Sequence, residues 1–159
     1  MKKGYNQILW LDGIEFKYLQ EIGTMNIFVV IDGVVLTPSL DEGTILPGVT
    51  RDSVVSILKD LNIPVEERKI SIDELIEASQ NGTLEDAFGA GTAATISFIE
   101  SIGYKDLDLK LPAIENRSIS NQLKNILQTI KDGKSEDKFG WMYKISVNET
   151  IHQEKKVEI

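Results

Sequence analysis

The sequence contains no cysteine and a single histidine, His152, among its 159 residues. Without cysteine, disulfide bonds and thiolate metal sites are excluded, and the composition fits a reducing compartment, so we expect a cytoplasmic protein. His, Asp and Glu residues nowhere cluster at the spacing of metal ligands, so no metal site is predicted. His152 lies in a polar tail, where a surface role is a simpler interpretation than a Ser-His-Asp triad.

Long apolar runs and a surplus of basic residues are also missing. No apolar run reaches the roughly 18 residues that cross a bilayer. Polar residues interrupt the segment after the basic start at Lys2 and Lys3, so no signal peptide is predicted. The 17 basic and 25 acidic residues give a formal net charge of -8. Because nucleic acids and anionic membranes are bound by clustered Lys and Arg, neither is an expected partner.

What is present suits one soluble domain with a full hydrophobic core, since 42 % of the 159 residues are apolar. We expect this domain over residues 4–145 and a polar tail over residues 146–159. Strand-like alternation begins almost at once, at residues 7–11. Such an early strand is compatible with a piece cut from a longer protein.

Hydrophobic periodicity predicts a mixed α/β domain with three helices. Two Asp-Gly dipeptides, at 12–13 and 32–33, predict tight hairpin turns in an antiparallel meander. Thr50 is the expected N-cap of the first helix, and residues 71–74 match a capping box before the second. Strands are expected over 7–11, 16–22, 25–31, 34–37, 65–70 and 95–102. Helices are expected over 50–62, 71–79 and 118–131, with a short last element at 141–145.

Three segments carry residue types that suit a ligand site. Residues 46–50 (LPGVT) place a glycine-containing loop before a helix, where free N–H groups and the helix dipole favour a phosphate. Residues 89–93 (GAGTA) let the backbone of an expected loop approach a carboxylate or phosphate closely. Glu21, at a strand end beside Gly23 and Thr24, suits a cationic ligand atom.

Each segment also has a simpler explanation, namely a helix cap, a turn or bulge between strands, and a solvated glutamate on an edge strand. In combination, two anion-binding segments and one carboxylate fit a cofactor with a phosphate at one end and a protonated ring nitrogen at the other. The residues alone leave both interpretations open.

Residues 20–28 (QEIGTMNIF), 45–51 (ILPGVTR) and 88–93 (FGAGTA) resemble, in order and approximate spacing, the signature segments of a known family. They are similar to the C-terminal domain of branched-chain amino-acid aminotransferases, which are pyridoxal-phosphate (PLP) enzymes of fold type IV. The opening QILWLD at 7–12 fits as well, and the resemblance extends over residues 4–145. It implies a mixed-sheet pseudo-barrel with three helices.

The resemblance implies an enzyme that exchanges the amino group between leucine, isoleucine or valine and 2-oxoglutarate. Its partners would be these amino acids and 2-oxo acids, its own N-terminal domain, and a second copy in a homodimer. The GTMN stretch at 23–26 favours this enzyme over its fold relatives, the D-amino-acid aminotransferases and aminodeoxychorismate lyases. A stand-alone, non-catalytic domain that binds a ligand or partner is a further alternative.

The resemblance also implies roles for single residues around PLP. Glu21 would keep the pyridine nitrogen protonated, so that the ring acts as an electron sink. Val49 and Thr50 would bind the phosphate at the start of the helix, and Thr92 would add a second phosphate contact. Thr24 would lie beside the cofactor.

The resemblance implies that residues of the same segments also bind the substrate. Backbone N–H groups of Thr92 and Ala93 would receive its carboxylate, and Thr24 and Met25 would lie close to it. Some members of the family carry a redox-active Cys-x-x-Cys pair after this segment. The chain has residues 94–97 (ATIS) there, so this regulation cannot operate.

One element of the family site has no match. The lysine that holds PLP lies upstream of the glutamate, farther away than the 20 residues that precede Glu21 here. Lys2, Lys3 and Lys17 do not match it, and the main phosphate-binding arginine and the N-terminal domain also have no counterpart. We therefore expect that the chain alone does not catalyse transamination and binds PLP weakly at best.

Overall fold

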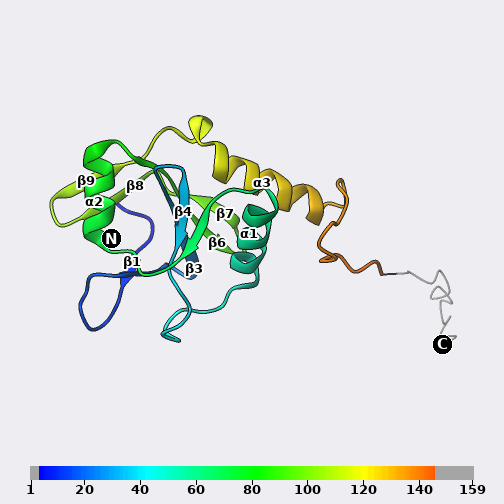
Figure 1. Cartoon of the computed structure of the whole chain (residues 1–159), viewed down its shortest axis with the longest axis horizontal. Coiled ribbons are helices and arrows are strands. Elements are labelled where there is room, and N and C mark those ends of the chain that lie inside the picture. The colour runs from blue at the N-terminus through cyan, green and yellow to red at the C-terminus, as the bar shows by residue number, and fades with distance from the viewer. Residues whose placement is uncertain (1–3, 146–159) are drawn as a thin grey trace, which may run out of the picture.

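The computed structural model describes residues 4–145 of the chain. Within that range nine strands and three α-helices, with one short 3-10 helix, make up a mixed α/β architecture (Figure 1). The strands are β1 (Leu9–Leu11), β2 (Leu19–Ile22), β3 (Met25–Ile31), β4 (Val34–Thr37), β5 (Val65–Glu67), β6 (Leu84–Gly91), β7 (Thr95–Phe98), β8 (Ser101–Tyr104) and β9 (Leu107–Lys110). The helices are α1 (Val49–Asp60), α2 (Ile72–Asn81) and α3 (Ser118–Lys131). The predicted fold class, with three helices, is confirmed.

Strand β3 is the centre of the main sheet. Along one edge it pairs with antiparallel β6, from Asn26 opposite Ala90 to Ile31 opposite Leu84. Along the other edge β2 pairs with the beginning of β3, and β4 pairs with its end. Beyond these, β1 joins β2, parallel β5 joins β4, and β7 joins β6. Because β2 and β4 share one edge of β3, the sheet divides there into two arms.

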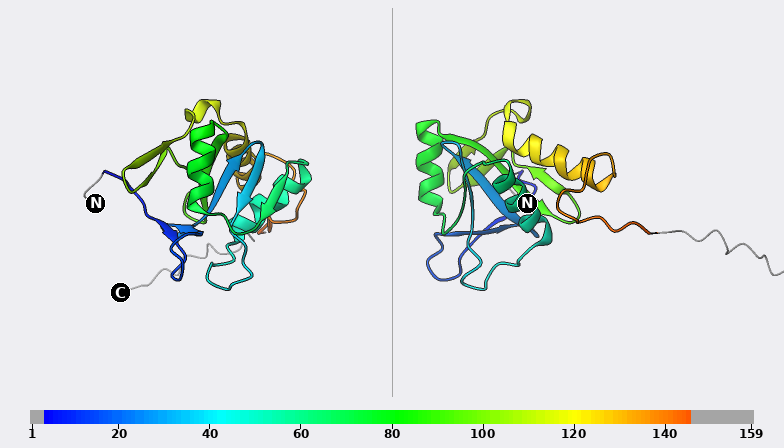
Figure 2. Two further views of the ribbon diagram at one scale, coloured as in Figure 1. Left: turned by 60° about the vertical axis from the view of Figure 1, so that its left-hand side comes forward. Right: turned by 45° about the vertical axis from the view of Figure 1, so that its right-hand side comes forward.

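Both faces of this sheet are covered. Side chains alternate along β3, so Ile27 and Val29 face one side while Phe28 and Val30 face the other. Helix α2 and the β8–β9 hairpin pack on the first face, and α1 and α3 pack on the second (Figures 1 and 2). Phe28 stacks on Phe88 with ring centroids 5.2 Å apart. Burial on both faces explains why β3 is an almost continuous apolar run.

One of the two predicted Asp-Gly turns is confirmed. Asp32 and Gly33 join β3 to β4 with φ angles of 50° and 75°, the left-handed conformation that this dipeptide favours. The prediction for Asp12 and Gly13 is wrong, because the chain forms a wider loop there. The Asp12 carboxylate accepts hydrogen bonds from the backbone N–H groups of Ile14, Glu15, Lys17 and Tyr18. These bonds, that of Tyr18 above all, hold the pKa of Asp12 well below its usual range.

Several strand boundaries differ from the prediction. β2 begins at Leu19 rather than at residue 16, since the wide loop takes up the residues before it. Residues 89–91 belong to β6 rather than to a loop, and only residues 92–94 turn. The single strand predicted over residues 95–102 is two strands, β7 and β8, in different sheets, and β9 was not anticipated. Residues 141–145 form no regular element.

The helices follow the prediction more closely. The capping box is confirmed, because the Ser71 hydroxyl accepts a hydrogen bond from Glu74 N at 3.1 Å, and α2 ends at left-handed Gly82. α3 has the predicted bounds. Thr50 is not the N-cap of α1, since the helix begins one residue earlier and Gly48 occupies the cap position.

Three further observations concern membrane spans, metal ligands and the C-terminal tail. No helix among residues 4–145 is long and apolar enough to cross a membrane. No group of three or more His, Cys, Asp or Glu residues in this range could hold a metal ion. His152 and the predicted polar tail lie outside the described residues.

Candidate functional site

The three predicted segments lie at the same end of the main sheet. β3 starts and β6 ends there, because Asn26 and Ala90 are partners across the two antiparallel strands. The β2–β3 turn with Thr24 and the β6–β7 turn with Thr92 are therefore neighbours at this edge. The loop before α1 joins them, since Leu46 O accepts a hydrogen bond of 2.9 Å from the Asn26 side chain. Segments far apart in the sequence thus meet around one strand end.

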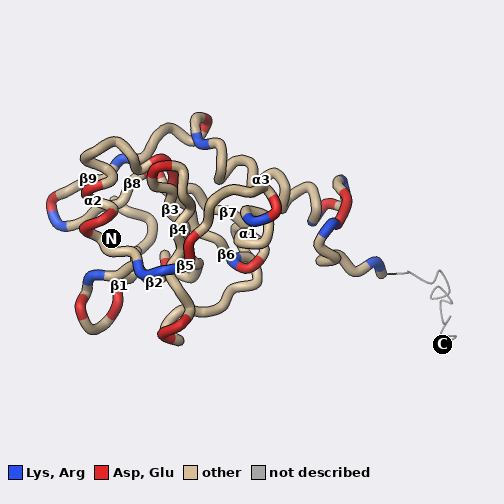
Figure 3. The backbone as a smooth tube through the Cα atoms, in the orientation of Figure 1, with Lys and Arg blue, Asp and Glu red and all other residues tan. Residues whose placement is uncertain are grey.

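Glu21 is half-buried on β2, directly opposite Asn26. It lines an open hollow of about 430 Å³ together with residues of the β1–β2 loop and of the loop before α1. The ionisable groups of this hollow are mostly acidic: Asp12, Glu15, Glu21 and Glu42, against Lys69. Figure 3 shows acidic stretches on both loops. Negative potential at this place favours a cationic group and disfavours a phosphate.

The N-terminus of α1 provides the opposite electrostatic environment. No side chain caps the helix at Gly48, and the first N–H of the helix with a backbone acceptor is that of Asp52, which donates to Gly48 O at 3.0 Å. Val49 is 82 % exposed, so the first turn is open to a ligand. The start of α2 differs, because there the Ser71 side chain caps the helix. Uncapped N–H groups at a helix start, together with the dipole, suit an anion.

Two buried side chains fix this helix start. The amide of Asn26, 5 % exposed, holds Leu46 O, and Gly48 packs so closely that an added Cβ would lie 2.3 Å from Asn26 Oδ1. Arg51, 4 % exposed, donates from Nη2 to Pro38 O at 2.9 Å and forms an ion pair of the same length with a glutamate of β5. The orientation of the first turn is therefore set from both sides.

The β6–β7 turn is shaped by close packing behind it. Cβ atoms at Gly89 and Gly91 would lie 2.9 Å and 2.8 Å from side-chain carbons of Met25, so a larger residue at either position would displace this methionine. Thr92 and Ala93 are exposed at the tip of the turn. Thr95, which follows the tip, has φ of 59°, a rare conformation for a β-branched residue. The strand end that leads into this tip is thus packed closely against Met25.

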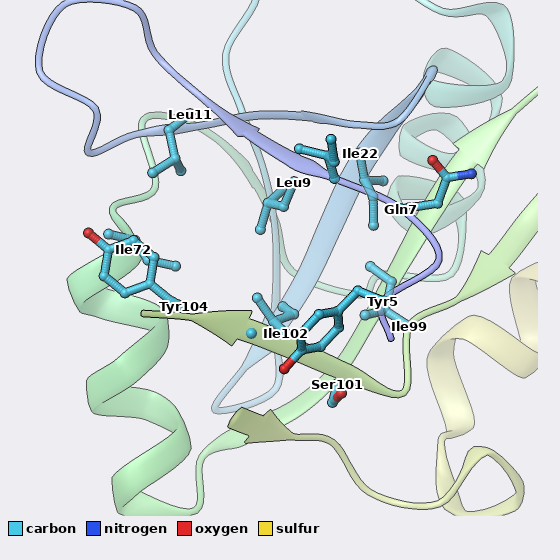
Figure 4. Close-up of a pocket in the computed structure, with 12 residues that line it drawn as sticks. Tyr5, Gln7, Leu9, Leu11, Ile22, Ile72, Ile99, Ser101, Ile102 and Tyr104 are labelled. Carbon is cyan, nitrogen blue, oxygen red and sulfur yellow. The ribbon is translucent and has the colours of Figure 1, made fainter. Parts of the chain in front are cut away.

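The structure brings these residues to one edge, yet not into one enclosed cavity. The hollow beside Glu21 is not lined by Val49, Thr50 or Thr92. An apolar cavity of about 400 Å³ lies between β1, β8 and the start of α2 (Figure 4). Tyr5, Leu9, Ile102 and Tyr104 are among its lining side chains, and none of the predicted site residues lines it. That cavity is separate from the site.

Sequence reasoning missed Asn26 and Arg51 as parts of the site. A signal for Asn26 was available, because asparagine is depleted in strands and this one interrupts an apolar strand. A signal for Arg51 was weaker, since an arginine in the first helical turn gives no sign of burial until the partner carbonyl and carboxylate are known.

A family model described as amino-transferase class IV matches residues 1–102 of the chain. The chain belongs to this family. Among curated proteins, this class IV amino-transferase chain is 47 % identical over 140 residues to the "Probable branched-chain-amino-acid aminotransferase" of Staphylococcus aureus (strain N315). The match covers 88 % of this chain and 39 % of that protein. The chain thus spans about two fifths of the length of the curated relatives it matches.

Solved structures show the same fold. The crystal structure of the branched-chain amino acid aminotransferase of Escherichia coli has a TM-score of 0.70 and 28 % identity, covering 88 % of this chain and 43 % of that one. The branched-chain amino acid aminotransferase of Thermobaculum terrenum, in its PLP-form, has a TM-score of 0.67 and 28 % identity, with 84 % and 40 % covered. The predicted resemblance to fold type IV aminotransferases is confirmed.

Proposed function

We propose that this class IV amino-transferase chain is the cofactor-binding part of a PLP-dependent enzyme. The whole enzyme would exchange the amino group between leucine, isoleucine or valine and 2-oxoglutarate. The observation that carries the proposal is the placement of an uncapped helix start and the Glu21 carboxylate on either side of Asn26. The names of the relatives support the reaction and the substrate class.

The donor groups present fit PLP. The phosphate would be held by the first-turn N–H groups of α1, at Val49 and Thr50, with the Thr50 hydroxyl as a further donor. Thr92, on the neighbouring turn, would add a donor from the other side. When bound, PLP supplies an electron sink that stabilises negative charge on the substrate α-carbon.

The remaining predicted residues orient the two reactants. Glu21, in acidic surroundings, would accept a hydrogen bond from the pyridine N–H and keep that proton on the ring. The exposed N–H groups of Thr92 and Ala93 would hold the substrate carboxylate. Thr24 and Met25 would flank the cofactor, and the Met25 side chain packs over the two glycines of β6.

Proton transfer is the step that this chain does not supply. The amine of Lys17 lies 4.0 Å from the Asp73 carboxylate, and the amine of Lys69, which lines the hollow beside Glu21, forms an ion pair with Glu42. We therefore propose that the described residues hold and polarise the cofactor, and that a lysine outside this sequence performs the proton transfer. An absorbance band which shows PLP covalently bound to a lysine of the isolated chain, and which survives gel filtration, would contradict this.

The binding role is tested with pyridoxamine 5'-phosphate, which carries an amine in place of the aldehyde and so does not react with surface lysines. Titration calorimetry on the full chain compares the wild type with Glu21→Gln and Thr50→Val. Thr50→Val should weaken binding about tenfold, the value of one hydrogen bond to a charged group. Thr129→Val, on the far helix α3, is the matched control and should bind like the wild type. Equal affinity for all four proteins would refute the proposed site.

A further inference from the structure

Asn26 is the one strongly polar side chain within β3, and it is almost fully buried at 5 % exposure. Burying an amide costs free energy unless its groups are satisfied. Its neighbours along the strand are apolar and fill the two cores. A buried amide at this point therefore needs a reason in the local structure.

The contacts of the side chain supply that reason. Nδ2 donates to Leu46 O at 2.9 Å, which ties the loop before α1 to the sheet. Oδ1 lies against Gly48, where a Cβ would approach it to 2.3 Å. The amide thus touches the loop at two residues on either side of Pro47. One side chain fixes the position of the chain immediately before the first turn of α1.

The backbone of the same residue fixes two other segments. Asn26 pairs with Glu21 on one edge of β3 and with Ala90 on the other. Ala90 lies two residues before Thr92 at the tip of the β6–β7 turn. Asn26 is consequently the common neighbour of the carboxylate strand, the helix start and the turn.

We propose that Asn26 is a positioning residue that sets the separation between the Glu21 carboxylate and the anion-binding start of α1. The inference rests on the proposed function, since it requires a ligand that uses both ends. A rigid ligand gains from two contacts together only when their spacing matches its own length. Without the Asn26 amide, each end keeps its own groups, but the spacing between them is no longer fixed.

Three probes separate spacing from binding at one end. Pyridoxamine 5'-phosphate carries both the ring nitrogen and the phosphate, pyridoxamine carries the ring alone, and inorganic phosphate carries the anion alone. Affinities for the full chain are measured by calorimetry, or by NMR titration where binding is weak. In Asn26→Asp the donor to Leu46 O is replaced by an oxygen, with almost no change in volume. Asn121→Asp is the matched control, because the Asn121 amide also donates to backbone carbonyls but lies on α3.

Asn26→Asp should weaken pyridoxamine 5'-phosphate about tenfold, because losing the fixed spacing removes the benefit of the second contact. The affinity for pyridoxamine alone should change less than about twofold, since it needs one end only. Phosphate alone is repelled by the new carboxylate but has no spacing to lose, so it should lose clearly less affinity than pyridoxamine 5'-phosphate. Asn121→Asp should leave all three affinities at the wild-type values. Circular dichroism and urea unfolding verify that each variant is folded.

Two outcomes overturn the inference and leave the proposed function intact. In the first, Asn26→Asp weakens phosphate as much as pyridoxamine 5'-phosphate, so that Asn26 only supports the helix. In the second, it changes none of the affinities. A wild type that binds pyridoxamine 5'-phosphate no better than phosphate overturns the proposed function itself. If Asn26→Asp does not fold, the smaller Asn26→Ala, which has no donor in its side chain, decides between the same outcomes.

Discussion

Replacing Gly48 with alanine tests how tightly the loop before α1 is packed. Gly48 has φ of -69° and ψ of 136°, so alanine fits its backbone conformation without strain. Its Cβ, however, would lie 2.3 Å from Asn26 Oδ1, and real Cβ atoms do not approach other atoms more closely than about 3.0 Å. The loop or the amide must therefore move, and the hydrogen bond between Asn26 and Leu46 O should break first.

The expected cost follows from these terms. Overpacking in a tightly filled site costs about 1–3 kcal/mol, and breaking the hydrogen bond costs about 1 kcal/mol. The reduced chain entropy of the unfolded state offsets about 0.4–1 kcal/mol of this. Gly48→Ala should therefore lower the free energy of unfolding by about 1–3 kcal/mol.

Urea unfolding followed by circular dichroism measures this cost. Gly13→Ala is the matched control, because no atom lies within 4 Å of its added Cβ and its φ is not in the left-handed region. That variant should equal or slightly exceed the wild type in stability. If Gly48→Ala is as stable as Gly13→Ala, the close packing of the loop against Asn26 does not exist in solution.

Three other predictions concern an ion pair of α2, the core beside α3 and the anchor of α1. The hydrogen bond from the Arg68 guanidinium lowers the pKa of Glu74 in the folded chain. The ionised Glu74 therefore stabilises the fold fully above its unfolded pKa, about 4.3, and this contribution is lost as the pH falls through the lower folded pKa. Glu74→Gln should destabilise at pH 7 and should reduce the loss of stability between pH 7 and pH 3; an unchanged pH dependence would contradict the assignment. Leu123→Ala, at a fully buried position of α3, should cost about 2–5 kcal/mol in urea unfolding, while Leu107→Ala, 44 % exposed, should cost far less. Arg51→Met should weaken phosphate binding in an NMR titration, because the first turn of α1 loses its anchor; unchanged binding would show that the anchor is dispensable.

Local signals in the sequence were sufficient for the helices and for one hairpin. The bounds of α3 and the Ser71 cap depend on residues within a few positions of each other, and so does the Asp32-Gly33 turn. The Asp12 loop could not be predicted in this way. Its shape depends on a carboxylate that binds N–H groups up to six residues away, which the dipeptide preference does not include.

For the candidate site too, short sequence segments predicted some residues, while contacts between distant residues were needed for others. Glu21, Thr50 and Thr92 could be predicted because short segments resemble a family, and they stay predictions. The register of β3 and β6, with the hydrogen bond from Asn26 to Leu46 O, places those segments at one edge. The unusual position of Asn26 in a strand was visible in the sequence, but its contact could not be predicted, because its hydrogen-bond acceptor is 20 residues away. In the sequence, the two glycines at the end of β6 are typical of a loop. In the structure they belong to a strand and leave room for the Met25 side chain, which only the packing distances show.

The most direct test of the account is to map the binding of pyridoxamine 5'-phosphate by NMR on the isotope-labelled full chain. If the three segments hold one ligand, backbone amide signals of Glu21, Thr50 and Thr92 should shift together, with a single saturation curve. Amides around the apolar cavity, such as that of Ile102, should not respond. Shifts confined to that cavity, or separate saturation curves for the helix start and the β6–β7 turn, would contradict the claim that the segments form one site.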